Sequence, residues 1–226
     1  MKTLYLIHGW TYTIKPWTTT LELLKQAGIK VKLLKVPGLT EPSKKVWTID
    51  DYVKWADQQI PNGAIALGHS NGGRILLNLC ANNPQKLSHL ILLASAGVYE
   101  PSRRKNFITF IAKLGKPLKK ITLINKLFHH LTGSTDYSQA PKNMQKTLTN
   151  LLYSDQTLKI STISTPTLIL WGKKDTVTPI RHAHYLHQHL LNSQLKIFSN
   201  WTHAPYISHP RELAKTLISI MQDLDK

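Results

Sequence analysis

The chain has one cysteine in 226 residues, so it cannot form an internal disulfide, and this agrees with a reducing compartment. We interpret Cys80 as a small buried side chain on a helix. Long hydrophobic runs are also missing, because the longest, such as residues 90–94, is far too short to cross a bilayer. The N-terminal segment lacks the long apolar stretch and small-residue cleavage site of a signal peptide. These absences predict a cytoplasmic protein with no membrane span.

Acidic residues are scarce, since 12 Asp and Glu stand against 29 Lys and Arg, a net charge of +17. Such a charge favours partners rich in phosphate or carboxylate, so nucleic acid has to be considered. The lysines are dispersed, however, and there is no zinc-finger spacing, RNA-binding aromatic motif or continuous basic helix. We attribute the excess to a proteome-wide lysine bias or to general solubility and do not expect a nucleic-acid partner.

Apolar runs that suit strands alternate along the chain with segments that suit helices. Strands are expected at residues 3–7, 31–36, 64–67, 87–94, 168–171 and 195–198, and helices at 16–27, 48–60, 74–81, 179–191 and 210–224. Such alternation implies right-handed crossovers. The fold class is therefore α/β, with three layers and a mostly parallel sheet of about six strands between helices.

One segment interrupts this rhythm, because residues 98–165 show helical patterns and no convincing strand. Its expected helices lie at residues 107–114, 121–131 and 144–152. The segment holds 11 Lys and Arg against 3 Asp and Glu, so it is itself basic. We interpret it as a helical cap inserted into one core made of residues 1–97 and 166–226.

The sequence Gly68-His69-Ser70-Asn71-Gly72 joins an expected strand to an expected helix. A Gly-x-Ser-x-Gly sequence at such a junction can hold its serine on a sharp turn with the hydroxyl exposed, where it can act as a nucleophile. Glycines on either side leave room for the crowded backbone. Ser70 is therefore the candidate nucleophile.

A serine hydroxyl needs an adjacent base, and the base needs a group that orients it. Asp175 follows the strand at residues 168–171, and His203 follows the last strand. Because the carboxyl ends of parallel strands meet at one edge of a sheet, we expect both residues to lie near Ser70.

The order Ser70, Asp175, His203, with the motifs His8-Gly9-Trp10 and Trp171-Gly172, resembles the α/β-hydrolase fold family over nearly the whole chain. The resemblance implies Ser70 as nucleophile, His203 as general base and then acid, and Asp175 as the orienting carboxylate. It also implies an oxyanion hole formed by the backbone N–H groups of Trp10 and Asn71.

Two departures from the family pattern are visible. The chain begins at the strand before the oxyanion loop, so we expect the family's first two strands to be missing, which would leave an exposed sheet edge and either a monomer or a homodimer. Thr202 stands where a glycine often precedes the histidine. Neither change removes a catalytic atom.

Other residues compete for these roles. Asp136 and Asp155 are rivals of Asp175, but both fall in the basic insertion rather than after a strand. His209 is a rival of His203, and we interpret it as a surface or capping residue at the start of the last helix. Six further histidines are favoured as solvated surface residues rather than metal ligands because no Asp or Glu joins them: His129, His130, His182, His184, His187 and His189.

Three residues of the insertion are possible substrate contacts. Arg103 and Arg104 could hold a carboxylate or phosphate of the substrate, although a solvated charge run is the favoured interpretation. Phe107 either packs the cap on the core or lines the site.

The sequence thus predicts a cofactor-independent serine hydrolase, of the carboxylesterase class, that cleaves a small carboxylic ester or thioester through an acyl-enzyme. The alternative is a non-hydrolytic member of the fold, either a lyase or a ligand-binding receptor.

Overall fold

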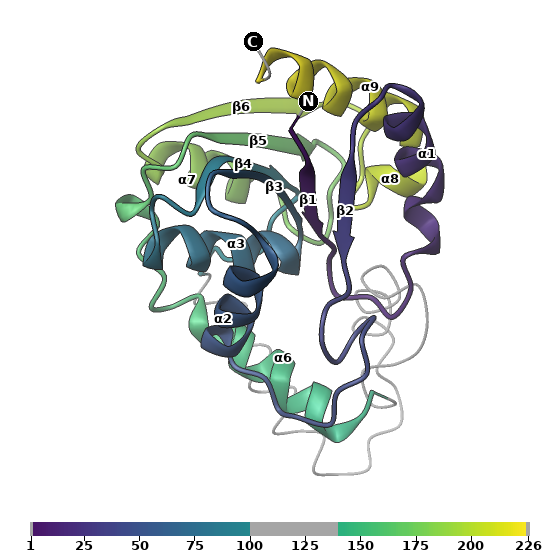
Figure 1. Ribbon diagram of the computed structural model, residues 1–226. Helices are drawn as coiled ribbons and strands as arrows, with labels where there is room; N and C mark the ends of the chain where they lie inside the picture. The colour runs from purple at the N-terminus through teal and green to yellow at the C-terminus, as the bar shows by residue number, and fades with distance from the viewer. Residues whose placement is uncertain (1, 100–139, 225–226) are drawn as a thin grey trace.

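The computed structural model describes residues 2–99 and 140–224 (Figure 1). Its six strands form one sheet in the order β2-β1-β3-β4-β5-β6, and every neighbouring pair is parallel. The strands are β1 (Leu4–Ile7), β2 (Val31–Leu34), β3 (Ala64–His69), β4 (Leu87–Leu93), β5 (Thr167–Gly172) and β6 (Ser193–Phe198). The predicted parallel sheet of about six strands is confirmed.

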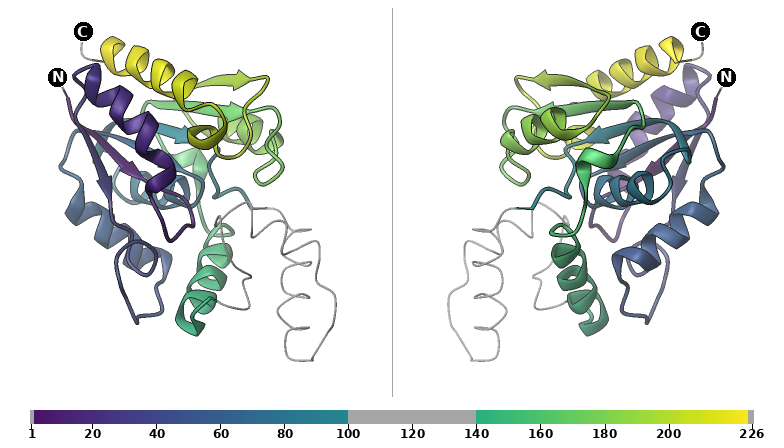
Figure 2. Two further views of the ribbon diagram at one scale, coloured as in Figure 1. Left: turned by 90° about the vertical axis from the view of Figure 1, so that its right-hand side faces the viewer. Right: turned by 90° about the vertical axis from the view of Figure 1, so that its left-hand side faces the viewer.

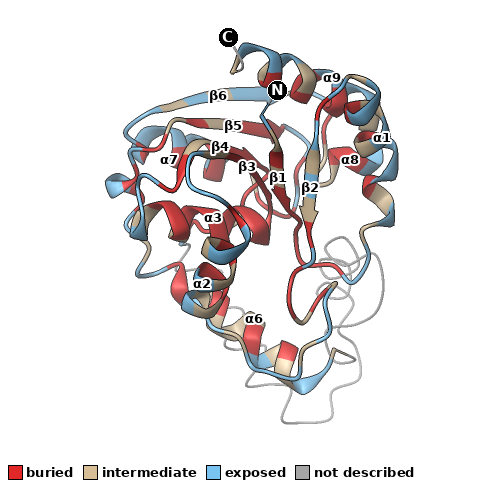
Figure 3. Ribbon diagram, viewed as in Figure 1, coloured by how far each residue is buried: buried red, intermediate tan, exposed pale blue. Residues whose placement is uncertain are grey.

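Helices cover both faces of the sheet (Figure 2). On one face α1 (Thr18–Gln26) packs beside α9 (Pro210–Asp223), and on the other α2 (Ile49–Gln59) packs beside α3 (Asn71–Asn82). Alternate strand residues explain the two layers, because Ile65 and Leu67 belong to the core under α1 and α9, whereas Ala66 belongs to the core under α2 and α3. Figure 3 shows that the inner strands and most of α3 are buried.

The described part of the predicted cap contains α6 (Lys142–Ser154) and the short helix η3 (Ile160–Thr162). Helix α6 lies along the segment that precedes α2, where the Thr147 hydroxyl accepts a hydrogen bond from the Trp47 amide at 2.9 Å and Asn150 donates to the Trp47 carbonyl at 3.1 Å. Met144 and Leu151 join the same core as α2. The helix predicted at residues 144–152 is confirmed, while those at 107–114 and 121–131 lie outside the described residues.

Three features differ from the sequence expectation. Helix α3 begins at Asn71, directly after Ser70, rather than at Arg74. Two short helices, η1 (Lys15–Trp17) and α8 (Pro205–Ser208), occupy segments that were expected to be a helix start and a loop. Helix α7 spans Arg181–His189 and is two residues shorter at each end than the helix predicted at 179–191. Among the described residues no helix has the length and apolar character needed to cross a membrane.

Candidate active site

Ser70 sits between β3 and α3 with φ 51° and ψ −116°, a backbone conformation that non-glycine residues seldom adopt. The turn is possible because its glycines allow close approach: a Cβ on Gly68 would lie 2.5 Å from the Gly73 Cα, and one on Gly72 would overlap the Ile7 carbonyl oxygen. The backbone of Ser70 is held by its amide, which donates to the Leu93 carbonyl at 3.1 Å, and by its own carbonyl, which accepts from the Ala96 amide at 2.9 Å. The strained serine is therefore fixed at the carboxyl end of β3.

Asp175 and His203 meet at the same edge of the sheet, as predicted. His203 Nδ1 lies 2.9 Å from Asp175 Oδ2, and both side chains are almost completely buried. The other carboxylate oxygen, Oδ1, accepts from the backbone amides of Val177 at 2.8 Å and Thr178 at 2.9 Å. These contacts fix the direction of the carboxylate, so it can hold His203 with the proton on Nδ1 and Nε2 free to accept one.

The protonation of Asp175 follows from its surroundings. Burial raises the pKa of its carboxyl, but the hydrogen bond and charge of His203 and the donors from Thr178 outweigh burial and leave the pKa below its usual value. Asp175 is therefore ionised near neutral pH. Among the described residues nothing pairs with the buried Nε2 of His203, so this nitrogen is available for a hydroxyl proton.

The backbone amides of Trp10 and Asn71, the predicted oxyanion donors, make no hydrogen bond to another group in the part of the chain that the structure describes. The loop that carries Trp10 is braced by His8, whose Nδ1 donates to the Gly9 carbonyl at 2.7 Å while Nε2 accepts from the Thr40 hydroxyl at 2.7 Å. Gly9 fits closely against the elbow, since a Cβ there would lie 2.8 Å from the His69 ring. Both amides are thus held on rigid backbone and remain free to donate.

The other candidate residues have varied outcomes. Asp155 forms a buried ion pair with Arg74, and His209 stands at the start of α9 and bonds Ser208. The prediction that His182 lies on a solvated helix surface is wrong, because it is 4% exposed on the inner face of α7; the other three histidines of this helix are exposed. The remaining candidates lie outside the described residues: Arg103, Arg104, Phe107, His129, His130 and Asp136.

Sequence reasoning did not anticipate the role of Thr178. Its hydroxyl lies 2.8 Å from Asp175 Oδ2, 3.1 Å from His203 Nδ1 and 3.1 Å from the Ala94 carbonyl oxygen. Thr178 therefore ties the Asp175–His203 pair to the end of β4. No spacing in the sequence indicates this contact.

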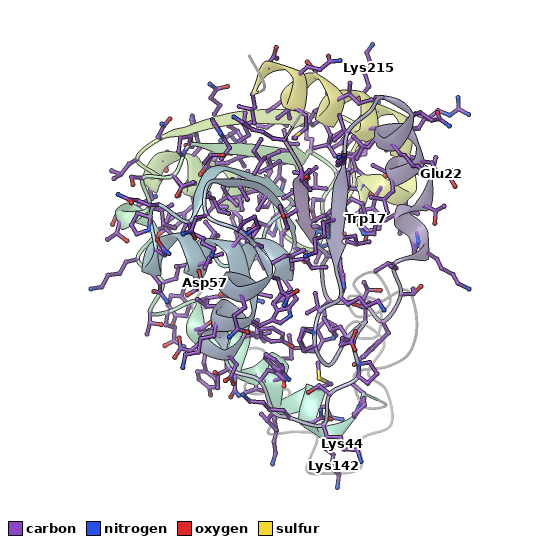
Figure 4. The ribbon with its side chains drawn as sticks, viewed as in Figure 1. Trp17, Glu22, Lys44, Asp57, Lys142 and Lys215 are labelled. Atoms are coloured by element: carbon purple, nitrogen blue, oxygen red, sulfur yellow. The ribbon has the colours of Figure 1, made fainter. Side chains whose placement is uncertain are left out.

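His69 was likewise not anticipated. Its Nε2 lies 2.9 Å from the backbone carbonyl oxygen of His203 and donates to it, and its ring packs edge-on against Trp17 and Tyr206. Figure 4 shows Trp17 beside β2. Burial lowers the pKa of His69 to about 3, with a smaller contribution from His203, so the ring is neutral and serves as a fixed donor.

Two neutral buried histidines predict a pH-dependent stability. Burial lowers the pKa of His8 to about 4 and that of His69 to about 3, both below the unfolded value of 6.5. As the pH falls below 6.5 the unfolded chain therefore takes up protons first, and the free energy of unfolding decreases toward pH 4 by about 1.4 kcal/mol per pH unit for each histidine. Above pH 6.5 this contribution is complete.

Urea unfolding at intervals from pH 7 to pH 4 measures this slope. His69→Phe should reduce the slope by about 1.4 kcal/mol per pH unit, since it removes one of the two groups. His184→Gln, a substitution on the exposed face of α7, should leave the slope unchanged. An unaltered slope in His69→Phe would show that His69 is not held neutral in the folded protein.

Comparison with known proteins agrees with this geometry. The family model described as alpha/beta hydrolase fold matches residues 2–210. The chain belongs to the alpha/beta hydrolase fold family. Two solved structures share the fold. An alpha/beta hydrolase enzyme from a sediment metagenome of the Mar Chica lagoon has a TM-score of 0.73 and 20% identity, and the match covers 100% of this chain and 93% of that one. A putative lipase from Acinetobacter baumannii has a TM-score of 0.74 and 21% identity, and the match covers 99% of this chain and 84% of that one.

Curated relatives of this hydrolase are esterases. A pimeloyl-[acyl-carrier protein] methyl ester esterase from Neisseria meningitidis is 28% identical over 95% of this chain and 91% of its own length. The enzyme of the same name from Aliivibrio fischeri has the same identity and coverage. The predicted α/β-hydrolase fold and the predicted ester-cleaving serine hydrolase of the carboxylesterase class are confirmed.

Proposed function

We propose that this hydrolase cleaves the methyl ester of an acyl chain borne on an acyl carrier protein, with Ser70 as nucleophile, His203 as base and acid, and Asp175 as the orienting carboxylate. The observation that carries the proposal is the buried pair of His203 and Asp175, which leaves His203 Nε2 unpartnered at the sheet edge where the strained Ser70 lies.

The first half-reaction acylates Ser70. His203 Nε2 takes the hydroxyl proton as Ser70 Oγ bonds to the ester carbonyl carbon, and the carbonyl oxygen becomes negative. The amides of Trp10 and Asn71 donate to this oxygen, and Asp175 stabilises the positive charge on His203. The tetrahedral intermediate then collapses, and His203 returns the proton to the methoxide, which leaves as methanol.

The second half-reaction releases the acid. A water molecule gives a proton to His203 Nε2 as its oxygen bonds to the acyl carbon, and the same two amides hold the negative oxygen. Collapse of this intermediate breaks the bond to Ser70 Oγ, which regains a proton from His203. The free carboxylate and the original enzyme result, so no cofactor is required for this route.

The proposal of a carrier-bound substrate is supported by the relatives' names and by the net charge of the chain. The relatives match over 91% of their own length, so the chain accounts for nearly the whole of each. The net charge of +17 favours association with an acidic partner. Lys44 and Lys142, the first residue of α6, are exposed and project at the same end of the molecule (Figure 4).

We place the reaction in the cytoplasm, a proposal supported by the free, buried Cys80, which needs no oxidising compartment.

The test compares a pimeloyl methyl ester on acyl carrier protein with the same methyl ester free in solution. We expect methanol release from both, with a higher kcat/KM for the carrier-bound ester and a decline of that advantage as salt is raised from 50 to 500 mM, because the attraction is electrostatic. Equal kcat/KM values at every salt concentration would contradict a carrier substrate. Absence of turnover for both would contradict the methyl esterase.

A further inference from the structure

Several buried polar atoms on the elbow and its neighbours have no hydrogen-bond partner among the described residues. Among the described residues five such atoms belong to the elbow, to the loops beside it or to rings packed on it: Trp10 Nε1, Trp17 Nε1, His69 Nδ1, Asn71 Nδ2 and His203 Nε2. Buried polar groups are almost always paired, so such a cluster points to a polar ligand that completes the pairs. The proposed mechanism uses Nε2 of His203 but gives no role to Nδ2 of Asn71.

The orientation of the Asn71 side chain is fixed by Arg74. Arg74 Nη1 donates to Asn71 Oδ1 at 2.6 Å. A guanidinium has donors only, so the oxygen of the amide must face Arg74 and the NH2 group must face the other way. Asn71 is 3% exposed, and its NH2 group is a donor held in place with nothing to donate to among the described residues.

Arg74 is in turn held by Asp155. Arg74 Nε lies 2.7 Å from Asp155 Oδ1 and Nη2 lies 2.9 Å from Oδ2, a two-point ion pair between side chains that are 6% and 7% exposed. A buried ion pair adds little net stability compared with an apolar pair of similar volume, but its geometry is highly directional. The pair joins the end of α6 to the first turn of α3, and it determines which way Asn71 points.

We propose that the Asn71 side chain donates a hydrogen bond to a second acceptor oxygen of the substrate, distinct from the oxygen of the cleaved ester carbonyl. Arg74 and Asp155 are positioning residues for this donor. The inference rests on the proposed esterase function and adds a substrate class to it: esters with a further carbonyl or ether oxygen, in preference to all-hydrocarbon esters of the same length.

The experiment uses methyl esters of one chain length, a hydrocarbon ester and a series in which an amide carbonyl occupies successive chain positions. The wild-type protein should prefer at least one member of the series by about tenfold in kcat/KM, the effect of one net hydrogen bond. Asn71→Leu, which removes the donor but keeps the backbone N–H, should abolish this preference, so that kcat/KM for the preferred ester falls about tenfold relative to kcat/KM for the hydrocarbon ester.

Two further variants separate orientation from folding. Arg74→Met combined with Asp155→Leu replaces the ion pair by apolar side chains, so the fold should persist. Because Asn71 is then no longer oriented, the preference for an ester with a second oxygen should fall toward the value found in Asn71→Leu. Asn78→Leu makes the same change two turns along α3, where the side chain bonds the Arg74 carbonyl at 2.9 Å, and should keep the full preference.

Four outcomes would overturn the inference. An equal loss on all esters in Asn71→Leu, or no loss on any, would mean that its side chain does not recognise a second oxygen. A wild-type protein that cleaves every ester equally would also overturn the inference but would leave the esterase proposal intact. A wild-type protein that cleaves no ester and does not react with a fluorophosphonate would overturn both.

Discussion

Ser70→Ala is expected to lower kcat for a short-chain p-nitrophenyl ester by about 10⁶-fold, because the nucleophile and the base act as one unit. The folded protein should persist. Alanine at the same strained position makes the same backbone contacts, which run through the amide and carbonyl of residue 70 rather than through the hydroxyl. Initial-rate kinetics with the purified variant, together with its thermal unfolding midpoint, measure both effects.

The matched control for this variant is Ser88→Ala. Ser88 lies at the amino end of β4, the opposite edge of the sheet from Ser70, and its hydroxyl donates to the Ala64 carbonyl at 3.3 Å. It should keep kcat within about twofold, as surface substitutions away from a site do. A Ser70→Ala protein with more than one per cent of the wild-type rate would contradict the assignment of Ser70.

Asp175→Asn is expected to lower kcat by about 10⁴-fold with little change in structure. The amides of Val177 and Thr178 both donate to Oδ1, so the asparagine must keep its oxygen there and turn its NH2 group toward His203. A donor facing Nδ1 forces the histidine proton onto Nε2. His203 could then no longer accept the proton of Ser70, and the loss of rate would arise from the wrong tautomer.

Kinetics and a structure-sensitive measurement together check this prediction. The near-ultraviolet circular dichroism of Asp175→Asn should match that of the wild-type protein, while kcat falls. Asp57→Asn is the matched control, since the Asp57 side chain is 47% exposed and pairs with Lys86 at 2.8 Å, and it should remain fully active. If Asp175→Asn kept wild-type kcat, the orientation of His203 by Asp175 would have no part in the reaction.

The sheet and the proximity of Asp175 and His203 could be predicted because each depends on local sequence. Apolar runs of strand length alternate with helical patterns, and the carboxyl ends of parallel strands must share one edge. The start of α3 could not be predicted in this way. Asn71, Gly72 and Gly73 have low helix propensity, yet the close packing of the elbow makes them the first turn.

Contacts between segments far apart in the chain also could not be predicted from the sequence. Arg74 and Asp155 are 81 residues apart, and no pattern in either segment indicates the other. The burial of His182 follows from its place beside Ala183 and Leu186 on the inner face of α7, which a count of histidines does not reveal. Such contacts depend on how helices pack, and packing is decided by the whole core.

The most direct test of the account is to map the site of covalent reaction. After treatment with a fluorophosphonate and digestion with trypsin, the peptide of residues 55–74 should carry one adduct, and Ser70 is the sole serine in that peptide. Mass spectrometry should find this adduct in the wild-type protein, find none in Ser70→Ala, and find that its formation parallels the loss of esterase activity. An adduct on a different serine, or loss of activity with this peptide unmodified, would contradict Ser70 as the nucleophile.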